Sequence, residues 1–357
     1  MSSPDWDLLS SYAGLLALAC GSIYAGSFGS LPNPKREDGS SPDEDDEEEV
    51  AERMSSGDAW LFPVFGSVAL FGLYTIVKYF GKEWINWFLG WYFSVAGVMS
   101  VWKSSISITR FFLGATRWKQ FEKTTFLIKK GSNSLLSLSW RTPSLCLFPL
   151  AVIPSAIYSL STASRRPVLM TDILSLSFSH NALSLLKIDS FQTGAVLLSG
   201  LFFYDIWWVF GTEVMVKVAT TLDVPIKLLW PKSLTFSDAR GFTMLGLGDV
   251  VIPGTLIAFA LRYDHHRALK SNASPQSSFP RPYFHAVLTA YFLGLVTTMS
   301  VMHFFGKAQP ALLYLSPACI LSFVLTAAIR GELRDAWNWN DDPESLETAA
   351  AADKKSN

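Results

Sequence analysis

The chain has 357 residues, half of which are hydrophobic, and it contains 26 phenylalanines and 13 tryptophans. Its formal net charge of −1 says little about partners, and no nucleic-acid partner is expected. The apolar residues gather in repeated blocks instead of following amphipathic periods, which excludes an ordinary soluble fold. Each block has about 20 residues, the length needed to span ~30 Å of hydrocarbon, so the lipid bilayer is the expected surrounding.

The blocks predict an all-α polytopic membrane protein with nine transmembrane helices. In chain order, the expected helices cover residues 8–28, 59–80, 84–102, 144–162, 168–188, 194–216, 241–261, 283–304 and 309–329. The first helix has the length of a secretory signal peptide, but Asp5 and Asp7 precede it where a signal peptide carries basic residues. We therefore expect the first helix to be retained in the mature protein.

The distribution of basic residues predicts the orientation of the chain. Most of the 29 lysines and arginines lie on the cytosolic side if the N-terminus lies outside the cytosol. The positive-inside rule thus favours an external N-terminus and a cytosolic C-terminus. In this arrangement the glycosylation sequon at Asn272 lies in the cytosol, where we expect it to stay unmodified.

Two connections between the expected helices have distinctive compositions. The connection 30–57 contains the acidic run SSPDEDDEEEVAE (40–52) and is predicted to be a disordered cytosolic loop. The connection 103–143 is predicted to be a basic cytosolic loop. The segment 102–130, which includes most of this connection, mixes aromatic and basic residues. This mixture is typical of an amphipathic segment at an anionic membrane surface.

Two carboxyl groups fall inside apolar blocks that are consecutive in the chain. Asp205 stands at the centre of 194–216, and Asp249 stands near the middle of 241–261. An ionisable group in the bilayer costs roughly 2.5–3.5 kcal/mol on insertion scales, and no lysine or arginine lies at the same depth to form a salt bridge. Two neighbouring carboxyls can share one proton, since both cannot ionise together. That division of roles, one acid and one carboxylate, is what hydrolysis of an amide by two aspartates requires.

The residues around Asp249 are suited to contact with an extended backbone. Gly246 and Gly248 place no side chain beside the carboxyl, so another backbone could approach closely. Pro253 cannot donate the helical hydrogen bond to the Asp249 carbonyl, which predicts a loosened helix at this point. Near the other carboxyl, Tyr204 offers a hydroxyl group at a similar depth, although its direction is not fixed by the sequence.

The carboxyl pair alone fits two chemistries equally well, proteolysis and proton-coupled transport with the carboxyls as a relay. The sequence lacks the H-E-x-x-H motif of zinc proteases, a G-x-S-G serine signature and the D-T-G or D-S-G of pepsin-like enzymes. His180 and His303 lie in expected helices and are interpreted as packing or interfacial residues. Pro310 suits the start of the last helix, where its missing N–H costs little.

Three short motifs, YD (204–205), GLGD (246–249) and QPAL (309–312), resemble the signature of the GxGD intramembrane aspartyl proteases. The longer stretches FFYDIWWVFGTEVMVKVA, MLGLGDVVIPG and QPALLYLSPACI are similar to the signal peptide peptidase family, which is related to presenilin. The resemblance extends over about 168–330, which it marks as the catalytic half. It implies that Asp205 and Asp249 are the catalytic pair, and that the enzyme uses no metal or cofactor.

The resemblance also implies which residues support the site and bind substrate. They are Tyr204, Gly246, Leu247, Gly248, Pro310, Ala311 and Leu312. The last three are expected to pack against the carboxyls, at the start of the final helix. The implied substrates are transmembrane helices of type II orientation, including the signal peptides left in the membrane after signal peptidase has acted.

The family likeness predicts a presenilin-like nine-helix domain over 1–335, followed by a cytosolic tail over 336–357. The tail ends in Lys354-Lys355-Ser356-Asn357, which looks like a dilysine signal for retrieval to the endoplasmic reticulum. The expected orientation, lumenal N-terminus and cytosolic C-terminus, agrees with signal peptide peptidase and is opposite to presenilin. A homo-oligomer, partners in the degradation machinery and a non-catalytic role as chaperone or adaptor all stay open.

Overall fold

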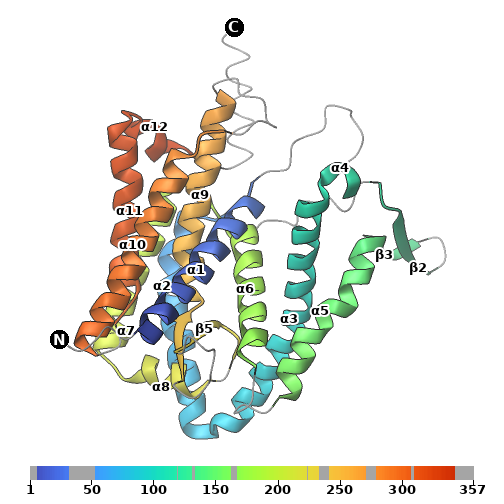
Figure 1. Cartoon of the computed structure of the whole chain (residues 1–357), viewed down its shortest axis with the longest axis horizontal. Helices are drawn as coiled ribbons and strands as arrows, with labels where there is room; N and C mark the ends of the chain where they lie inside the picture. The colour runs from blue at the N-terminus through green and yellow to red at the C-terminus, as the bar shows by residue number, and fades with distance from the viewer. Residues whose placement is uncertain are drawn as a thin grey trace.

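The computed structural model describes residues 6–31, 53–118, 120–130, 133–161, 167–222, 224–232, 241–270, 279–306 and 309–341. Within these ranges the chain is mainly helical, as Figure 1 shows. The acidic run 40–52, the sequon at Asn272 and the dilysine pair lie outside the described residues, so the expectations about them remain predictions.

The long helices follow the order expected from the apolar blocks. They are α1 (Trp6–Gly29), α2 (Ser56–Phe80), α3 (Lys82–Leu113), α5 (Thr142–Leu160), α6 (Val168–Leu185), α7 (Phe191–Phe210), α9 (Gly248–Lys270), α10 (Pro282–Phe305) and α11 (Leu312–Ile329). Shorter helices are α4 (Ala115–Trp118), α8 (Val214–Thr221) and α12 (Leu333–Asn338). Three pairs of strands connect them: β1 (Arg53–Met54) with β4 (Lys187–Ile188), β2 (Lys123–Lys130) with β3 (Asn133–Arg141), and β5 (Lys227–Pro231) with β6 (Phe242–Gly246).

Six helices in the described part of the chain are long and apolar enough to cross a membrane. They are α1, α2, α5, α7, α10 and α11. The chain is therefore mainly helical, as expected, with helices suited to a multi-pass membrane protein, but the three strand pairs were not anticipated by the expected all-α class. The helices α3, α6 and α9 overlap the other three expected spans but carry more polar residues, so a total of nine spans stays a prediction.

Helix α9 forms the centre of the fold. Its residues are buried without interruption from Pro253 to Asp264. Figure 1 shows α9 running between α10 and α11 on one side and α6 on the other, and α1 packs against it as well. Small residues allow this packing, because a Cβ at Gly254 would lie 2.7 Å from the side chain of Leu183 in α6.

The expectation of a loop over 103–143 was wrong for most of its length. Helix α3 continues to Leu113, and β2 and β3 form an antiparallel hairpin that Figure 1 shows at the edge of the molecule. The indole N–H of Trp102 donates a hydrogen bond of 2.7 Å to the carbonyl of Ser144, and its ring packs edge-on against Trp140 of β3. Apolar and polar residues alternate in β3, which favours a strand. The expected loop was based on the basic composition of the whole connection, which does not reveal this alternation.

The expected helix over 241–261 was also wrong in its first part. Residues 242–246 form β6, whose backbone pairs with β5, and the helix begins only at Gly248. Glycine at 246 and 248 disfavours helix, while β5 supplies hydrogen-bond partners for an extended chain. Asp249 consequently stands in the first turn of α9 and not in the middle of a helix.

Candidate active site

Asp205 is a buried carboxylic acid in the second half of α7, with 3% of its surface exposed. The helix begins after Ser190, whose hydroxyl accepts a hydrogen bond from the backbone N–H of Thr193. It ends at Phe210, so Asp205 lies in its last turns and not at its centre, as the apolar block suggested. The end of α7 thus presents the carboxyl toward the starts of α9 and α11, with which α7 packs.

The first residues of α11 provide a hydrogen-bond donor to Asp205. The backbone N–H of Leu312 donates to Oδ2 of Asp205 across 3.2 Å. The N–H groups of a first helical turn have no acceptor within the helix, and the positive end of the helix dipole favours a nearby acid oxygen. Pro310 and Ala311 are buried in the turn before the helix, which begins two residues later than expected from Pro310. Of these three residues, Leu312 contacts the carboxyl through its backbone N–H; the supporting role that the resemblance implies for Pro310 and Ala311 stays a prediction.

Asp249 lies where the strand β6 turns into α9. The N–H of Leu247 donates to the carbonyl of Ile226 (2.9 Å), and the Leu247 carbonyl accepts from the first N–H groups of α9. Leu247 is therefore the residue at which the chain changes from strand to helix. Gly246 and Gly248 are both exposed, and a Cβ at Gly246 would lie 3.3 Å from Oδ2 of Asp249. The two glycines leave one side of the half-buried carboxyl open to an approaching backbone.

The structure brings the two carboxyls together. Asp205 and Asp249 lie within range of a direct electrostatic interaction, although they are 44 positions apart in the chain. Among the described residues the pair lies where α7, α9 and α11 pack on one another. The reason is the antiparallel direction of α7 and α9, which places the end of the first beside the start of the second. The Asp205 carboxyl thus accepts a hydrogen bond from a backbone N–H, whereas the Asp249 carboxyl lies beside the exposed backbone of two glycines.

Tyr204 lies beside the pair but on the outer side of α7. Its ring faces α2, because a Cβ at Gly66 would lie 3.5 Å from it, and it also contacts the ring of Trp208. A hollow of about 560 Å³ between α2 and α7 is bordered by Tyr204 together with Pro63, Gly200 and Phe203. Tyr204, which is next to Asp205 in the chain, therefore borders a mainly apolar hollow on the outer side of α7.

Comparison with known proteins identifies the family. The family model for signal peptide peptidase matches residues 46–343. Signal peptide peptidase of Homo sapiens is 36% identical over 346 residues, which cover 95% of this chain and 85% of the human protein. A probable intramembrane protease of Schizosaccharomyces pombe is 35% identical over 301 residues, covering 84% of this chain and 88% of the yeast protein. The chain belongs to the signal peptide peptidase family.

Membership in this family decides between the two chemistries that the carboxyl pair left open. The chain is an intramembrane aspartyl protease, and the comparisons give the transporter alternative no support. Intramembrane protease 2 of Caenorhabditis elegans is also similar to this chain. It is 46% identical over 184 residues, which cover 50% of this chain and 39% of the worm protein.

In this signal peptide peptidase family member, Pro253 does not loosen α9 as expected. The helix continues through the proline, and the Asp249 carbonyl accepts a hydrogen bond of 3.2 Å from the hydroxyl of Tyr291 in α10. The expectation failed because a donor from a neighbouring helix replaced the missing backbone N–H. Sequence reasoning missed Tyr291, since a proline shows that a carbonyl is free but not which residue will reach it.

Residues of α6 fasten the hairpin that leads to Asp249, and these were also missed. Oδ1 of Asp172 accepts a hydrogen bond of 2.8 Å from the N–H of Leu229 in β5. The hydroxyl of Ser175 lies 3.0 Å from the Pro225 carbonyl and 2.8 Å from that of Lys227. An ionisable residue inside an expected span, such as Asp172, was the available signal. The hairpin is thereby attached to the helix bundle next to the site.

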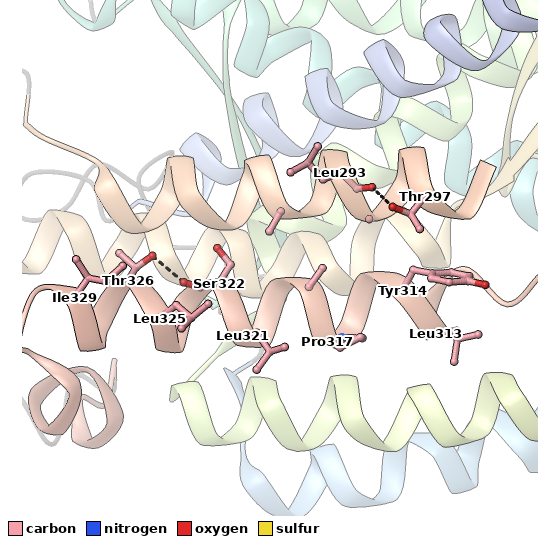
Figure 2. A pocket seen from close by; sticks show the side chains of 13 residues that line it. Leu293, Thr297, Leu313, Tyr314, Pro317, Leu321, Ser322, Leu325, Thr326 and Ile329 are labelled. Carbon is pink, nitrogen blue, oxygen red and sulfur yellow. Dashed lines mark hydrogen bonds between the residues drawn. The ribbon is translucent and has the colours of Figure 1, made fainter. Parts of the chain in front are cut away.

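A separate groove of about 510 Å³ lies on the outer face of α10 and α11. Figure 2 shows Thr297 bonded to the carbonyl of Leu293, and Thr326 to that of Ser322. These hydroxyls are satisfied within their own helices, which suits an apolar surrounding. No acid lines this groove, so it is distinct from the carboxyl pair.

Proposed function

We propose that Asp205 and Asp249 are the catalytic pair of this intramembrane protease. The observations that support this most strongly are the packing of α7 on α9, which brings Asp205 close enough to Asp249 for their charges to interact, and the hydrogen bond from the Leu312 N–H to Asp205. In the proposed reaction the carboxylate of the pair takes a proton from water. The acid of the pair donates its proton to the carbonyl of the scissile peptide bond, which water attacks.

The strand β6 offers a place for the unwound part of a substrate helix. An unwound segment in the bilayer needs hydrogen-bond partners for its backbone, since hydrocarbon offers none. In the described chain β6 pairs with β5 on one edge, and its residues Met244 and Gly246 are exposed. We propose that the substrate adds a strand to β6, which would carry the scissile bond past Gly246 to Asp249. From the sequence alone, the stretches near Pro253 and Pro310 were the expected partners of the unwound substrate; β6 takes that role in the present proposal.

The hollow between α2 and α7 is the proposed path of lateral access. Phe203 is 69% exposed and Trp207 is 67% exposed, so this face of α7 is suited to contact with lipid or with an apolar substrate helix. Tyr204, the neighbour of Asp205 in the chain, borders this hollow. A helix that reached the hollow from the membrane would therefore come beside the carboxyl pair without crossing a polar surface.

The proposed topology has nine spans, with the N-terminus in the lumen of the endoplasmic reticulum and the C-terminus in the cytosol. The burial of α9 supports its inclusion, since polar residues of a central helix face other helices and not lipid. Asp172 of α6 is likewise hydrogen-bonded inside the protein. In this topology the single domain of 1–335 contains the site on its lumenal side, which suits signal peptides and other helices of type II orientation.

The test uses the purified chain in liposomes with a labelled type II signal-peptide helix, and identifies the products by mass. Wild type is expected to cleave inside the apolar stretch, whereas Asp205→Asn and Asp249→Asn are expected to leave the substrate intact. Glu213→Gln, at a side chain that is 85% exposed, is the matched control and should cleave at the rate of wild type. Cleavage by either aspartate variant would contradict the proposed pair.

A further inference from the structure

The backbone carbonyl of Asp249 accepts a hydrogen bond from a tyrosine side chain and not from the backbone of its own helix. Pro253, four positions later, has no N–H to donate to this carbonyl, although α9 continues through it. The hydroxyl of Tyr291 in α10 supplies the missing hydrogen bond at 3.2 Å. Pro253 thus removes one backbone hydrogen bond of α9, and Tyr291 on the neighbouring helix α10 supplies a side-chain hydrogen bond in its place.

The burial of Tyr291 explains why this bond is specific. Its side chain is 0% exposed and packs in the core where α9 and α10 meet. A buried tyrosine hydroxyl needs a hydrogen-bond partner, and a buried carbonyl without a donor is equally costly. The single bond between Tyr291 and Asp249 satisfies both groups at once.

The bond acts at the residue that carries one of the two acids. Two positions before Asp249, the N–H of Leu247 donates to the carbonyl of Ile226, which directly precedes β5. On its carbonyl side, Asp249 is bonded to Tyr291 of α10. We propose that Tyr291 is a positioning residue that fixes the first turn of α9, and with it the direction of the Asp249 carboxyl toward Asp205. This proposal rests on the proposed function of the pair.

A positioning role predicts a specific kinetic effect. Tyr291→Phe removes the hydroxyl and keeps the ring, so the packing of α10 is retained. Loss of one buried hydrogen bond is expected to lower kcat about tenfold, since small displacements of a catalytic group are costly. KM should change less than about twofold, because substrate would pair with β6 and not with α10.

The decisive test is a double-mutant cycle with Pro253→Ala. Alanine at 253 restores a backbone N–H that can bond to the Asp249 carbonyl, so the tyrosine hydroxyl becomes dispensable there. Tyr291→Phe should therefore reduce kcat about tenfold in the wild-type background but less than about twofold in the Pro253→Ala background. Tyr283→Phe is the matched control on α10, because its hydroxyl bonds to Glu332 instead. This control should leave kcat unchanged.

Each outcome of the cycle decides one question. Equal losses of kcat in both backgrounds, or no loss in wild type, would overturn the role of Tyr291. A variant with a lowered melting temperature is compared at a temperature where all four proteins are folded, so that instability does not imitate the kinetic effect. Cleavage by Asp249→Asn in the same assay would contradict the proposed catalytic pair itself. The results of the cycle, in contrast, bear only on the role of Tyr291.

Discussion

The backbone N–H of Leu312 and the carboxyl of Asp205 are joined by a hydrogen bond of 3.2 Å, which connects the start of α11 to the end of α7. The side chain of Leu312 reinforces this connection. It is 5% exposed and packs in a small cluster with Ala59, Leu197 and Leu201. The residue therefore acts through its backbone on the acid and through its side chain on the helices that hold the acid.

Truncation of this side chain should loosen the connection while the backbone donor remains. We expect Leu312→Ala to destabilise the protein by about 2–3 kcal/mol, since a buried leucine is replaced by a cavity, and to lower the cleavage rate. Leu312→Met conserves the side-chain volume and should retain most of the stability and most of the cleavage rate. Melting temperature and cleavage rate in the same detergent would check this. An unchanged melting temperature in Leu312→Ala would contradict the packing role.

The two glycines beside Asp249 should respond differently to the same substitution. A Cβ at Gly246 would lie 3.3 Å from Oδ2 of Asp249, which requires the carboxyl to shift. At Gly248 the nearest atom would be Cδ1 of Ile252 at 3.9 Å, an ordinary contact. Gly246→Ala should therefore lower kcat about tenfold, and Gly248→Ala less than about threefold, as steady-state cleavage assays would measure. The opposite order would show that space for substrate matters more than the position of the acid.

The proposed sharing of one proton predicts a bell-shaped dependence of cleavage on pH. At low pH both Asp205 and Asp249 are protonated and no carboxylate can activate water. At high pH both are ionised and no acid remains for the carbonyl. The two apparent pKa values read from the profile would belong to the pair and not to either residue. A rate that reached a plateau on either side, in vesicles stable over that range, would contradict the mechanism.

The composition of the chain was sufficient to predict the long helices, because apolar length is a local property that a bilayer selects directly. The carboxyl pair could also be predicted, since an acid in an apolar block is conspicuous. The depth argument correctly expected Asp205 and Asp249 to lie near each other, but it placed them wrongly within their helices. Both acids lie near helix ends, where α7 finishes and α9 begins.

The sequence could not predict the contacts that hold the acids. The strand β6 looked like the first part of an apolar span, because its extended form depends on pairing with β5 rather than on its own residues. Likewise, Tyr291 and Asp172 act through partners 42 and 57 positions away. Such pairings are set by tertiary packing, which no local pattern reveals.

The attachment of the hairpin to α6 gives a further prediction. Asp172→Ala would leave the half-buried N–H of Leu229 without this acceptor, at a cost of about 1–3 kcal/mol. Because β5 holds β6 beside Asp249, cleavage should slow as well. Asp172→Asn keeps an acceptor oxygen and should retain most of the stability and the rate. Equal losses in both variants, measured by thermal unfolding and cleavage, would show that the charge and not the hydrogen bond matters.

The last prediction concerns the contact between the second half of α9 and the segment after α12, away from the carboxyl pair. Arg262 is 3% exposed, and its guanidinium donates to Asp341 across 2.6 Å and to the carbonyl of Ile188 across 2.9 Å. The N–H of Asp341 in turn donates to the Asp189 carbonyl at 2.7 Å. This network joins the segment after α12 to the connection before α7, and hence to the helix that carries Asp205.

Removing one partner of a buried pair leaves a charge without compensation, which costs far more than the loss of an exposed pair. Asp341→Ala should therefore destabilise the protein by about 2–3 kcal/mol, whereas Asp341→Asn, which keeps an acceptor for Arg262, should lose less. Glu213→Ala breaks the exposed bridge to Lys217 and should change stability by less than about 1 kcal/mol. The melting temperatures of the three variants in detergent would measure the order. If Asp341→Ala melted at the same temperature as Glu213→Ala, the buried pair would not stabilise this end of the bundle.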